Sequence, residues 1–291
     1  MTTVNLNLRI TTCVKPDALI LNYLEKITND IKQYENVVYR VIERKKLSIS
    51  SLFDIDESPL LVIQHDGIVL YTAADNKIFY HENTTRVKYK SLINQGNIPP
   101  LIEIFDKDSE VKIVIDATMG MANDLILMAL SLPGCKFYAF EENFYIHFAI
   151  KWGIIFYYAE INKDFLDTDR IHFVYGNVVN RIDILQKAQV IYVDPMYEET
   201  VKQSNIASLV KFVDHHLAND YKLLNFICSN FSGKVILRAH FRSGLINDFG
   251  FKMNVRKQSK THYGYKIVKN NKKASVIPKP FYYSVIHMLI M

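Results

Sequence analysis

Residues 114–124 read Val-Ile-Asp-Ala-Thr-Met-Gly-Met-Ala-Asn-Asp. An apolar run ends here in a tight turn around Gly120, and a helical pattern follows. Such a strand–turn–helix unit points backbone N–H groups at a ligand from the start of the helix. The stretch predicts a ligand-binding loop that contains Asp116, Thr118 and Gly120. The alternative is that Asp116 and Thr118 only cap the helix.

The glycine pattern of this turn limits which classes of ligand can bind there. Gly120 is its only glycine, and Ala122 stands where a second would be, so the GxGxxG pattern of dinucleotide sites is absent. Without those glycines a pyrophosphate fits poorly, whereas S-adenosylmethionine (SAM) carries no phosphate. We therefore expect SAM as the cofactor, and a nicotinamide dehydrogenase is the least favoured class of enzyme.

The pattern around this stretch predicts an α/β fold. Strand-like and helical segments alternate from Lys112 onward, which is typical of a mostly parallel, Rossmann-like sheet with crossover helices. An antiparallel C-terminal hairpin completes it. The expected strands are 112–116, 136–140, 171–175, 189–193, 234–237, 251–255 and 264–268. The expected helices are 122–132, 143–158 and 205–218.

The first hundred residues have a different character. A helix over 16–33 and a hairpin around His65-Asp66-Gly67 indicate a small N-terminal α+β domain. We therefore predict a domain at 1–100 and a SAM-binding domain at 101–291. The other expected elements are strands at 9–13, 37–42, 60–64, 68–72 and 78–81, and a helix at 84–94.

Polar residues follow the predicted strands. Glu141 stands ~20 residues beyond the glycine turn, the spacing at which an acid meets ribose hydroxyls. Gly176-Asn177 closes the next strand, and Asn177 can bind the edge of adenine. Both have plainer interpretations, because an acid also caps a helix and Asn after Gly is common in turns.

The most specific stretch is Ile191-Tyr192-Val193-Asp194-Pro195-Met196-Tyr197. It delivers a carboxylate, a proline and an aromatic ring to the carboxyl end of the sheet. An exocyclic amine of a base is a poor nucleophile, and Asp194 with the Pro195 carbonyl can accept its N–H bonds. Tyr197 can stack on the base. The alternative is a strand that ends in an Asp-Pro turn.

Composition and charge limit the location and the partners that we expect. The three cysteines lie far apart without zinc or disulfide spacing, so we expect no metal site and a reducing, cytoplasmic location. No apolar run is long enough for a membrane span. Between Lys234 and Lys279 the only acid is Asp248 among twelve Lys and Arg residues, which favours a polyanionic partner such as RNA. His240 and Arg242 follow the fifth strand and can touch substrate.

Together these residues resemble the J-type small-subunit ribosomal RNA guanine-N2 methyltransferases and a related group of uncharacterised bacterial methyltransferases. The resemblance also covers Thr11-Thr12 with Lys15-Pro16, Glu43-Arg44-Lys45 and Phe79-Tyr80-His81. It implies a class I methyltransferase core with a small N-terminal domain. By position, the SAM contacts that it implies are Asn123, Asp124, Glu141, Glu142, Gly176, Asn177 and Asp194.

The chain departs from this family at Ala122, at Asn123 in place of a common arginine, and at Arg238, where a lysine is frequent. Met196 after the proline is more distinctive than a generic Asp-Pro-Pro-Tyr motif. We expect catalysis by Asp194, Pro195 and Tyr197, and substrate contacts from Met196, Arg238, His240 and Arg242. The expected function is SAM-dependent methylation of RNA, with guanine N2 of ribosomal RNA favoured. The alternatives are methylation of DNA, protein or a small molecule, and a non-catalytic RNA-binding module.

Overall fold

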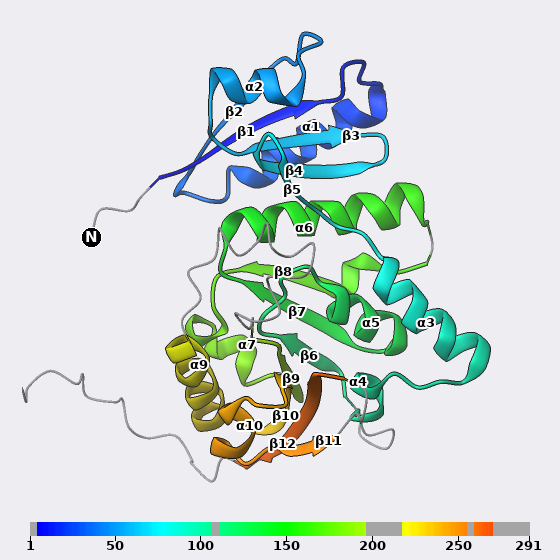
Figure 1. The fold of residues 1–291 in the computed structure, drawn as a ribbon, viewed down its shortest axis with the longest axis vertical. Coiled ribbons are helices and arrows are strands. Elements are labelled where there is room, and N and C mark those ends of the chain that lie inside the picture. Colours follow the sequence, from blue (N-terminus) through cyan, green and yellow to red (C-terminus); the bar gives the residue numbers. More distant parts are fainter. Residues whose placement is uncertain (1–4, 106–110, 164, 196–216, 255–258, 270–291) are drawn as a thin grey trace, which may run out of the picture.

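Two β-sheets form the framework of the protein (Figure 1). The computed structural model describes residues 5–105, 111–163, 165–195, 217–254 and 259–269. The N-terminal sheet has the strand order β2-β1-β3-β4-β5, and the second has the order β11-β12-β10-β9-β6-β7-β8. The second sheet carries the cofactor turn, so its edges define where a ligand can bind.

The N-terminal sheet is mixed. β1 pairs in parallel with both β2 and β3, whereas β3, β4 and β5 form antiparallel pairs. The central strands β1 and β3 are buried over continuous runs of residues, whereas β4 alternates between buried and partly exposed residues, with Ile68 and Leu70 buried. Its elements are β1 (Leu6–Thr12), α1 (Ala18–Ile31), β2 (Val37–Val41), α2 (Ile49–Ile55), β3 (Leu60–Gln64), β4 (Gly67–Ala73) and β5 (Asn76–Phe79).

The second sheet is parallel through its centre and antiparallel at one end. β10, β9, β6, β7 and β8 run in parallel, and β12 returns antiparallel between β10 and β11. This confirms the predicted fold class. Its strands are β6 (Ile113–Asp116), β7 (Lys136–Glu141), β8 (Ile171–Tyr175), β9 (Val190–Val193), β10 (Gly233–His240), β11 (Lys252–Asn254) and β12 (Thr261–Val268).

The predicted helices 84–94, 122–132 and 143–158 correspond to α3, α5 and α6, whereas the short helices α4, α7 and α10 were not predicted. The predicted helix 205–218 lies largely outside the described residues. The described helix α9 spans Leu217–Asn230, and no helix was predicted beyond residue 218. The helices are α3 (Asn83–Gln95), α4 (Pro100–Glu103), α5 (Asn123–Ser131), α6 (Phe144–Phe156), α7 (Ile182–Leu185), α9 (Leu217–Asn230) and α10 (Gly244–Asp248). Shorter turns are η1 (Tyr157–Ile161), η2 (Thr168–Arg170) and η3 (Val178–Asn180).

Helix α6 lies between the two sheets and packs on both (Figure 1). It is apolar on nearly every side, as expected for a helix buried all round. Polar pairs fix it to α1: the Lys151 amine lies 2.8 Å from both oxygens of Asp30, and the Trp152 indole donates to the same carboxylate at 2.9 Å. The two sheets are therefore joined by one helix with a shared core.

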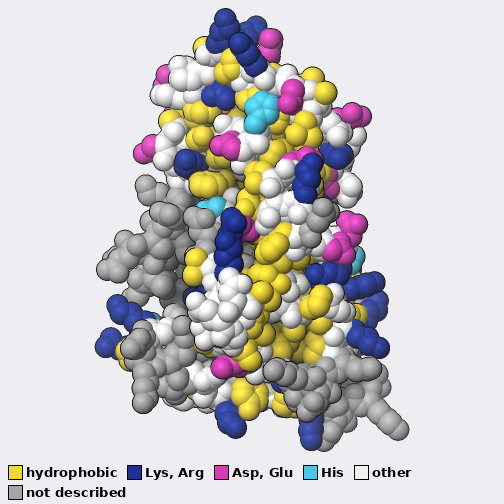
Figure 2. All heavy atoms as spheres, turned by 90° about the vertical axis from the view of Figure 1, so that its right-hand side faces the viewer, with side chains coloured by type: hydrophobic (Ala, Val, Ile, Leu, Met, Phe, Trp, Pro, Cys, Tyr) yellow, Lys and Arg dark blue, Asp and Glu magenta, His cyan; other side chains and the backbone are white. Residues whose placement is uncertain are grey.

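The division into domains at residue 100 remains a prediction. Helix α3 belongs to the first hundred residues but packs on α5 of the second sheet. The Thr85 hydroxyl donates to the Asn123 carbonyl at 2.8 Å. Hydrophobic side chains show in both the upper and the lower part of the face in Figure 2. Two apolar side chains of α3, Val87 and Ile93, are exposed.

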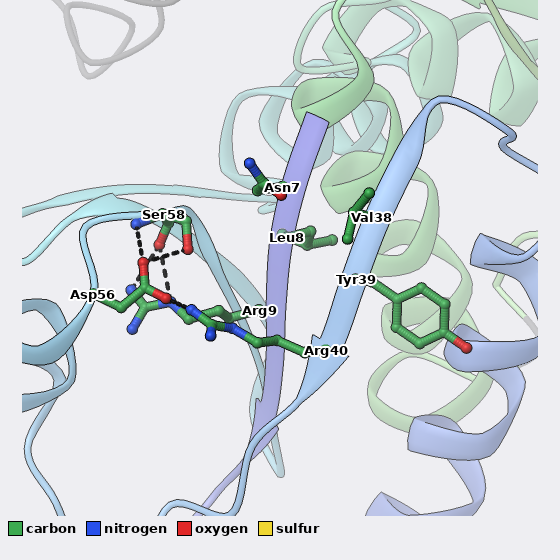
Figure 3. A pocket seen from close by; sticks show the side chains of 8 residues that line it. All are labelled: Asn7, Leu8, Arg9, Val38, Tyr39, Arg40, Asp56 and Ser58. Atoms are coloured by element: carbon green, nitrogen blue, oxygen red, sulfur yellow. Dashed lines mark hydrogen bonds and ion pairs between the residues drawn. The ribbon is translucent and has the colours of Figure 1, made fainter. Parts of the chain in front are cut away.

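Two cavities lie away from the carboxyl ends of the central strands. One of about 340 Å³ lies between β1 and β2 (Figure 3). Its buried Arg9 donates to the carbonyls of Leu52 and Ser58, both at 2.6 Å. Asp56 forms ion pairs with Arg9 and Arg40 beside them. The other, of about 760 Å³, is lined by Leu132, Gly134 and neighbours near the amino ends of β6 and β7.

Gly153 of α6 tests the joint between the sheets. A Cβ at this position would lie 2.9 Å from the Tyr80 Cβ, so Gly153→Val must push the two layers apart. We expect a loss of about 1–3 kcal/mol in the free energy of unfolding, measured with urea. Gly134→Val is the control, because nothing lies within 4 Å of a Cβ there. Equal stability of the two variants would contradict this account of the joint.

Candidate active site

The carboxyl ends of β6 and β9 meet at one point. The Asp194 amide, just after β9, donates to the Thr118 hydroxyl at 2.7 Å. The Ala117 amide donates to the Tyr192 carbonyl at 2.9 Å. The loop around Gly120 and the carboxylate that ends β9 are thus direct neighbours. The sequence pattern predicts this, because neighbouring parallel strands end at the same edge of a sheet.

The turn after β6 is held by its own polar groups. The Thr118 amide donates to Asp116 at 3.1 Å, and the Met119 amide donates to the Phe140 carbonyl of β7 at 2.8 Å. Asp116 is buried, and burial raises the pKa of its carboxyl well above the usual value; the Thr118 amide opposes this, and Asp124 and Asp194 reinforce it. Asp116 therefore stabilises the turn from its buried side by accepting the Thr118 amide.

Two residues of the turn adopt the left-handed backbone conformation, Gly120 with φ 50° and Ala122 with φ 59°. Glycine adopts it freely, whereas for alanine it costs ~1–2 kcal/mol. Ala122 therefore occupies a conformation that glycine favours, and the turn keeps its shape despite the missing glycine. Helix α5 begins at the next residue, Asn123.

Glu141 connects the ends of β6 and β7. Its two oxygens accept the Gly120 amide at 3.0 Å and the Asn143 amide at 2.8 Å. Burial raises the pKa of this carboxyl, and the two amides oppose that rise. The Gly176 amide donates to the Glu141 carbonyl at 2.8 Å, which brings the end of β8 beside it.

Glu142 and Asn177 lie next to Glu141. The Asn177 amide donates to the Glu142 carboxylate, and Asn177 also accepts the Val179 amide at 2.9 Å. The predicted adenine and ribose contacts are thus close together at the ends of β7 and β8. Their contact with a cofactor remains a prediction.

A cluster of charged side chains, with Asp124 buried and the others partly exposed, adjoins the Asp194 loop. Arg238 of β10 donates from Nη1 to Asp194 Oδ2 at 2.8 Å and to Asp124 Oδ2 at 3.1 Å. Asp124 also accepts the Tyr192 hydroxyl at 2.7 Å and the Lys88 amine at 3.2 Å. Burial by itself raises the pKa of Asp124, but the charges of Lys88 and Arg238 and the Tyr192 hydrogen bond outweigh it, so the pKa is lowered.

For the Asp194 carboxyl, burial outweighs the nearby positive charge, and the pKa is raised. Burial raises the pKa of its carboxyl to about 6, and Arg238 only partly opposes this effect. Its side chain is 28% exposed, so it can still meet a ligand from the solvent side. A carboxyl with this pKa is mostly ionised at neutral pH yet is able to take up a proton.

The remaining predicted residues are Pro195 and Tyr197, expected to be catalytic, and Met196, His240 and Arg242, expected to contact substrate. His240 ends β10 and accepts the Arg242 amide at 3.3 Å, so both follow directly after the strand that carries Arg238. Pro195 is buried next to Asp194. Met196 and Tyr197 lie outside the described residues.

No role was predicted for Lys88 or Tyr192. A signal exists for Tyr192, because a hydroxyl inside the buried run Ile191–Val193 needs a hydrogen-bond partner. Lys88 has no such signal, since it comes from a helix of the first hundred residues and reaches Asp124 only after folding.

The residues present are compatible with SAM. Each carboxylate oxygen of Glu141 accepts one backbone amide, which leaves a second lone pair on each for a ribose hydroxyl of the cofactor. A Cβ on Gly120 would have only the Thr118 carbonyl oxygen within 4 Å, at 3.9 Å, so the surface above the turn is clear for a ligand.

The sequence and fold belong to a known class of enzyme. A sequence profile described as "Putative SAM-dependent methyltransferase" matches residues 41–241, more than half of the chain. The protein therefore belongs to this family of SAM-dependent methyltransferases, and SAM is its cofactor. The fold agrees with a SAM-dependent methyltransferase from Neisseria gonorrhoeae at 14% identity and a TM-score of 0.54, over 91% of this chain and 97% of that one.

Two relatives extend this comparison. The uncharacterised protein YpiP of Bacillus subtilis is 28% identical over 265 residues, covering 88% of this chain and 97% of YpiP. Ribosomal RNA small subunit methyltransferase J of Actinobacillus pleuropneumoniae is 26% identical over 114 residues. That match covers 39% of this chain and 45% of the relative.

Two further findings concern the described residues. None of their helices is both long and apolar enough to cross a bilayer. Within the same ranges, His, Cys, Asp and Glu side chains form no group of three that can hold a metal ion.

Gly120→Val tests the cofactor turn. The new side chain would extend into the clear space above the turn, and we expect SAM binding to be lost by calorimetry. Gly96→Val is the matched control, because Gly96 also has a positive φ of 68° but ends helix α3. It should bear a similar backbone cost and still bind SAM. Retained SAM binding by Gly120→Val would contradict this placement of the cofactor.

Proposed function

We propose that this enzyme methylates an exocyclic amine of a base in structured RNA, with guanine N2 of ribosomal RNA as the favoured target. One observation carries the proposal: a half-buried carboxylate, followed by a buried proline, stands beside the cofactor turn at the end of β9. The likeness to methyltransferase J over 114 residues supports the substrate class. The basic stretch from Lys234 to Lys279 supports a polyanionic substrate.

Asp194 is the residue that engages the acceptor. The lone pair of an exocyclic amine is delocalised into the ring, and hydrogen bonds from its N–H groups to Asp194 and the Pro195 carbonyl draw it back toward nitrogen. Bound SAM supplies a methyl group activated by its sulfonium. When the amine nitrogen has formed its new bond, the surplus proton passes to Asp194, whose pKa of about 6 lets it release the proton at neutral pH.

Arg238 prepares Asp194 for this role. Its guanidinium binds Oδ2 and offers Oδ1 to the amine, and its charge favours the ionised carboxylate in a half-buried site. Asp124 holds the same nitrogen of Arg238 from the other side, so the guanidinium is fixed from two directions. This arrangement keeps the acceptor group in place before substrate arrives.

The RNA substrate is tested with purified enzyme, tritiated SAM and total RNA from cells that lack the gene. We expect label in RNA and, after nucleoside chromatography, in a methylated guanosine. Binding to that RNA should weaken steeply with salt, because phosphate contacts release counterions. Label in DNA, protein or small molecules but not in RNA would overturn the substrate claim. No turnover despite SAM binding would favour a non-catalytic RNA-binding module.

Asp194→Ala should reduce turnover about a hundredfold or more, since it removes the acceptor of the amine protons. Because Asp194 is also among the implied SAM contacts, SAM affinity is measured by calorimetry and the single-turnover rate is measured at saturating SAM, which separates lost chemistry from lost binding. Asp183→Ala is the control, because Asp183 is an exposed acid paired with Arg181 at the start of α7. A wild-type rate for Asp194→Ala would refute this mechanism even if SAM bound.

The pH dependence of the reaction follows from Asp194. Because its carboxyl has a pKa of about 6, the active carboxylate form is present above that pH and is lost as the pH falls through it. We expect the single-turnover rate to decline on the acid side with a midpoint near pH 6. The residual activity of Asp194→Asn should lack this limb. An acid limb that persists unchanged in Asp194→Asn would assign the titration to another group.

A further inference from the structure

A cysteine, a histidine and an aspartate meet on the N-terminal sheet, away from the methyltransferase site. Cys13 follows β1, His65 stands in the turn between β3 and β4, and Asp17 caps α1. β1 and β3 are parallel neighbours, with Thr12 opposite Ile63. Residues that follow the two strands therefore emerge side by side at the carboxyl end of this parallel pair.

The three side chains form a chain of contacts. The Cys13 sulfur lies 3.7 Å from His65 Nε2, and His65 Nδ1 lies 3.7 Å from Asp17 Oδ2. This is the order of nucleophile, base and orienting acid that activates cysteine in unrelated proteins. With its proton on Nδ1, facing Asp17, the imidazole leaves Nε2 to accept the thiol proton.

Two of these residues are held by the backbone. The Cys13 amide donates to the Ile63 carbonyl at 2.8 Å, which extends the pairing of β1 and β3 by one residue. Asp17 accepts the Ile20 amide at 3.0 Å through Oδ1 as the cap of α1, so its Oδ2 is left to face His65. The Cys13 main chain and the Asp17 carboxylate are thus held beside the turn that carries His65.

Cys13 and Cys228 are both partly exposed, and Cys13 differs from Cys228 by its contact with an imidazole. The side chains of His65 and Asp17 beside it are 55% and 56% exposed. Cys135 is buried and directs its sulfur to the Val111 carbonyl at 3.1 Å. Burial raises the pKa of the Cys135 and Cys228 thiols, so both are disfavoured as nucleophiles.

We propose that Cys13 is a reactive thiol that forms mixed disulfides with low-molecular-weight disulfides, and that His65 takes up its proton. The thiolate attacks one sulfur of RS–SR; a new bond forms between Cys13 and that sulfur, and the old disulfide bond breaks. The departing RS⁻ receives the proton from the imidazolium, so one RSH is released for each modified Cys13. Asp17 positions the imidazole. This site is independent of SAM and of the RNA substrate.

The test uses the full-length protein and oxidised glutathione at pH 7, with each cysteine followed by peptide mass spectrometry. We expect Cys13 to be modified about tenfold or more faster than Cys135 and Cys228. His65→Gln should slow modification of Cys13 about tenfold, by loss of its proton acceptor. Asp17→Asn should slow it less; asparagine keeps the helix cap while removing the charge.

His172→Gln is the matched control, since His172 is an exposed histidine stacked on Tyr138 in the other sheet. It should leave the Cys13 rate unchanged, and thermal unfolding should show that all variants are folded. In urea the three cysteines should react at similar rates, which would assign the selectivity to the fold. The proposal is overturned if native Cys13 reacts no faster than Cys228, or if His65→Gln and His172→Gln behave alike.

Discussion

The contact of Arg238 with two carboxylates is the constraint on which the active site depends. One guanidinium nitrogen lies within hydrogen-bond distance of both Asp124 and Asp194. These carboxylates come from α5 and from the end of β9, and Arg238 itself comes from β10. The two carboxylates repel each other, and the attraction of each to the shared guanidinium offsets that repulsion. Removing Arg238 would leave Asp194 without its cation and Asp124 with Lys88 alone, which is more costly than losing a surface ion pair.

The same cluster explains why the first hundred residues matter for the site. Lys88 of α3 donates to Asp124, and Thr85 binds the Asn123 carbonyl at the start of α5. The N-terminal part of the chain therefore braces the helix that follows the cofactor turn. With α6 packed between the two sheets, the cofactor turn and the N-terminal sheet share one core. We interpret the N-terminal sheet as part of the framework of the site as well as the carrier of Cys13.

The turn around Gly120 keeps its shape although it lacks the glycines of a glycine-rich loop. Ala122 takes the left-handed conformation that the missing glycine would favour, and Glu141 binds the Gly120 amide from the neighbouring strand. The shape of the turn is thus maintained by contacts from β7 rather than by glycine alone. This is why a single-glycine pattern, weak as a motif, still yields a loop suited to a phosphate-free cofactor.

The sequence alone determined where the main strands and the longer helices follow one another along the chain, because apolar periodicity is a local property. It also determined that Gly120, Glu141 and Asp194 follow strands and therefore lie at the carboxyl edge of the sheet. It did not reveal the helices α2, α4, α7 and α10, which are too short for a clear period. Nor did it reveal the roles of Lys88 and Tyr192. Only the tertiary structure decided which side chains neutralise Asp124 and how strongly burial shifts the pKa of Asp194. It also brought Cys13 to His65, 52 residues away along the chain. Such pairings depend on how strands and helices pack, and a linear pattern carries no information about partners so distant in the chain.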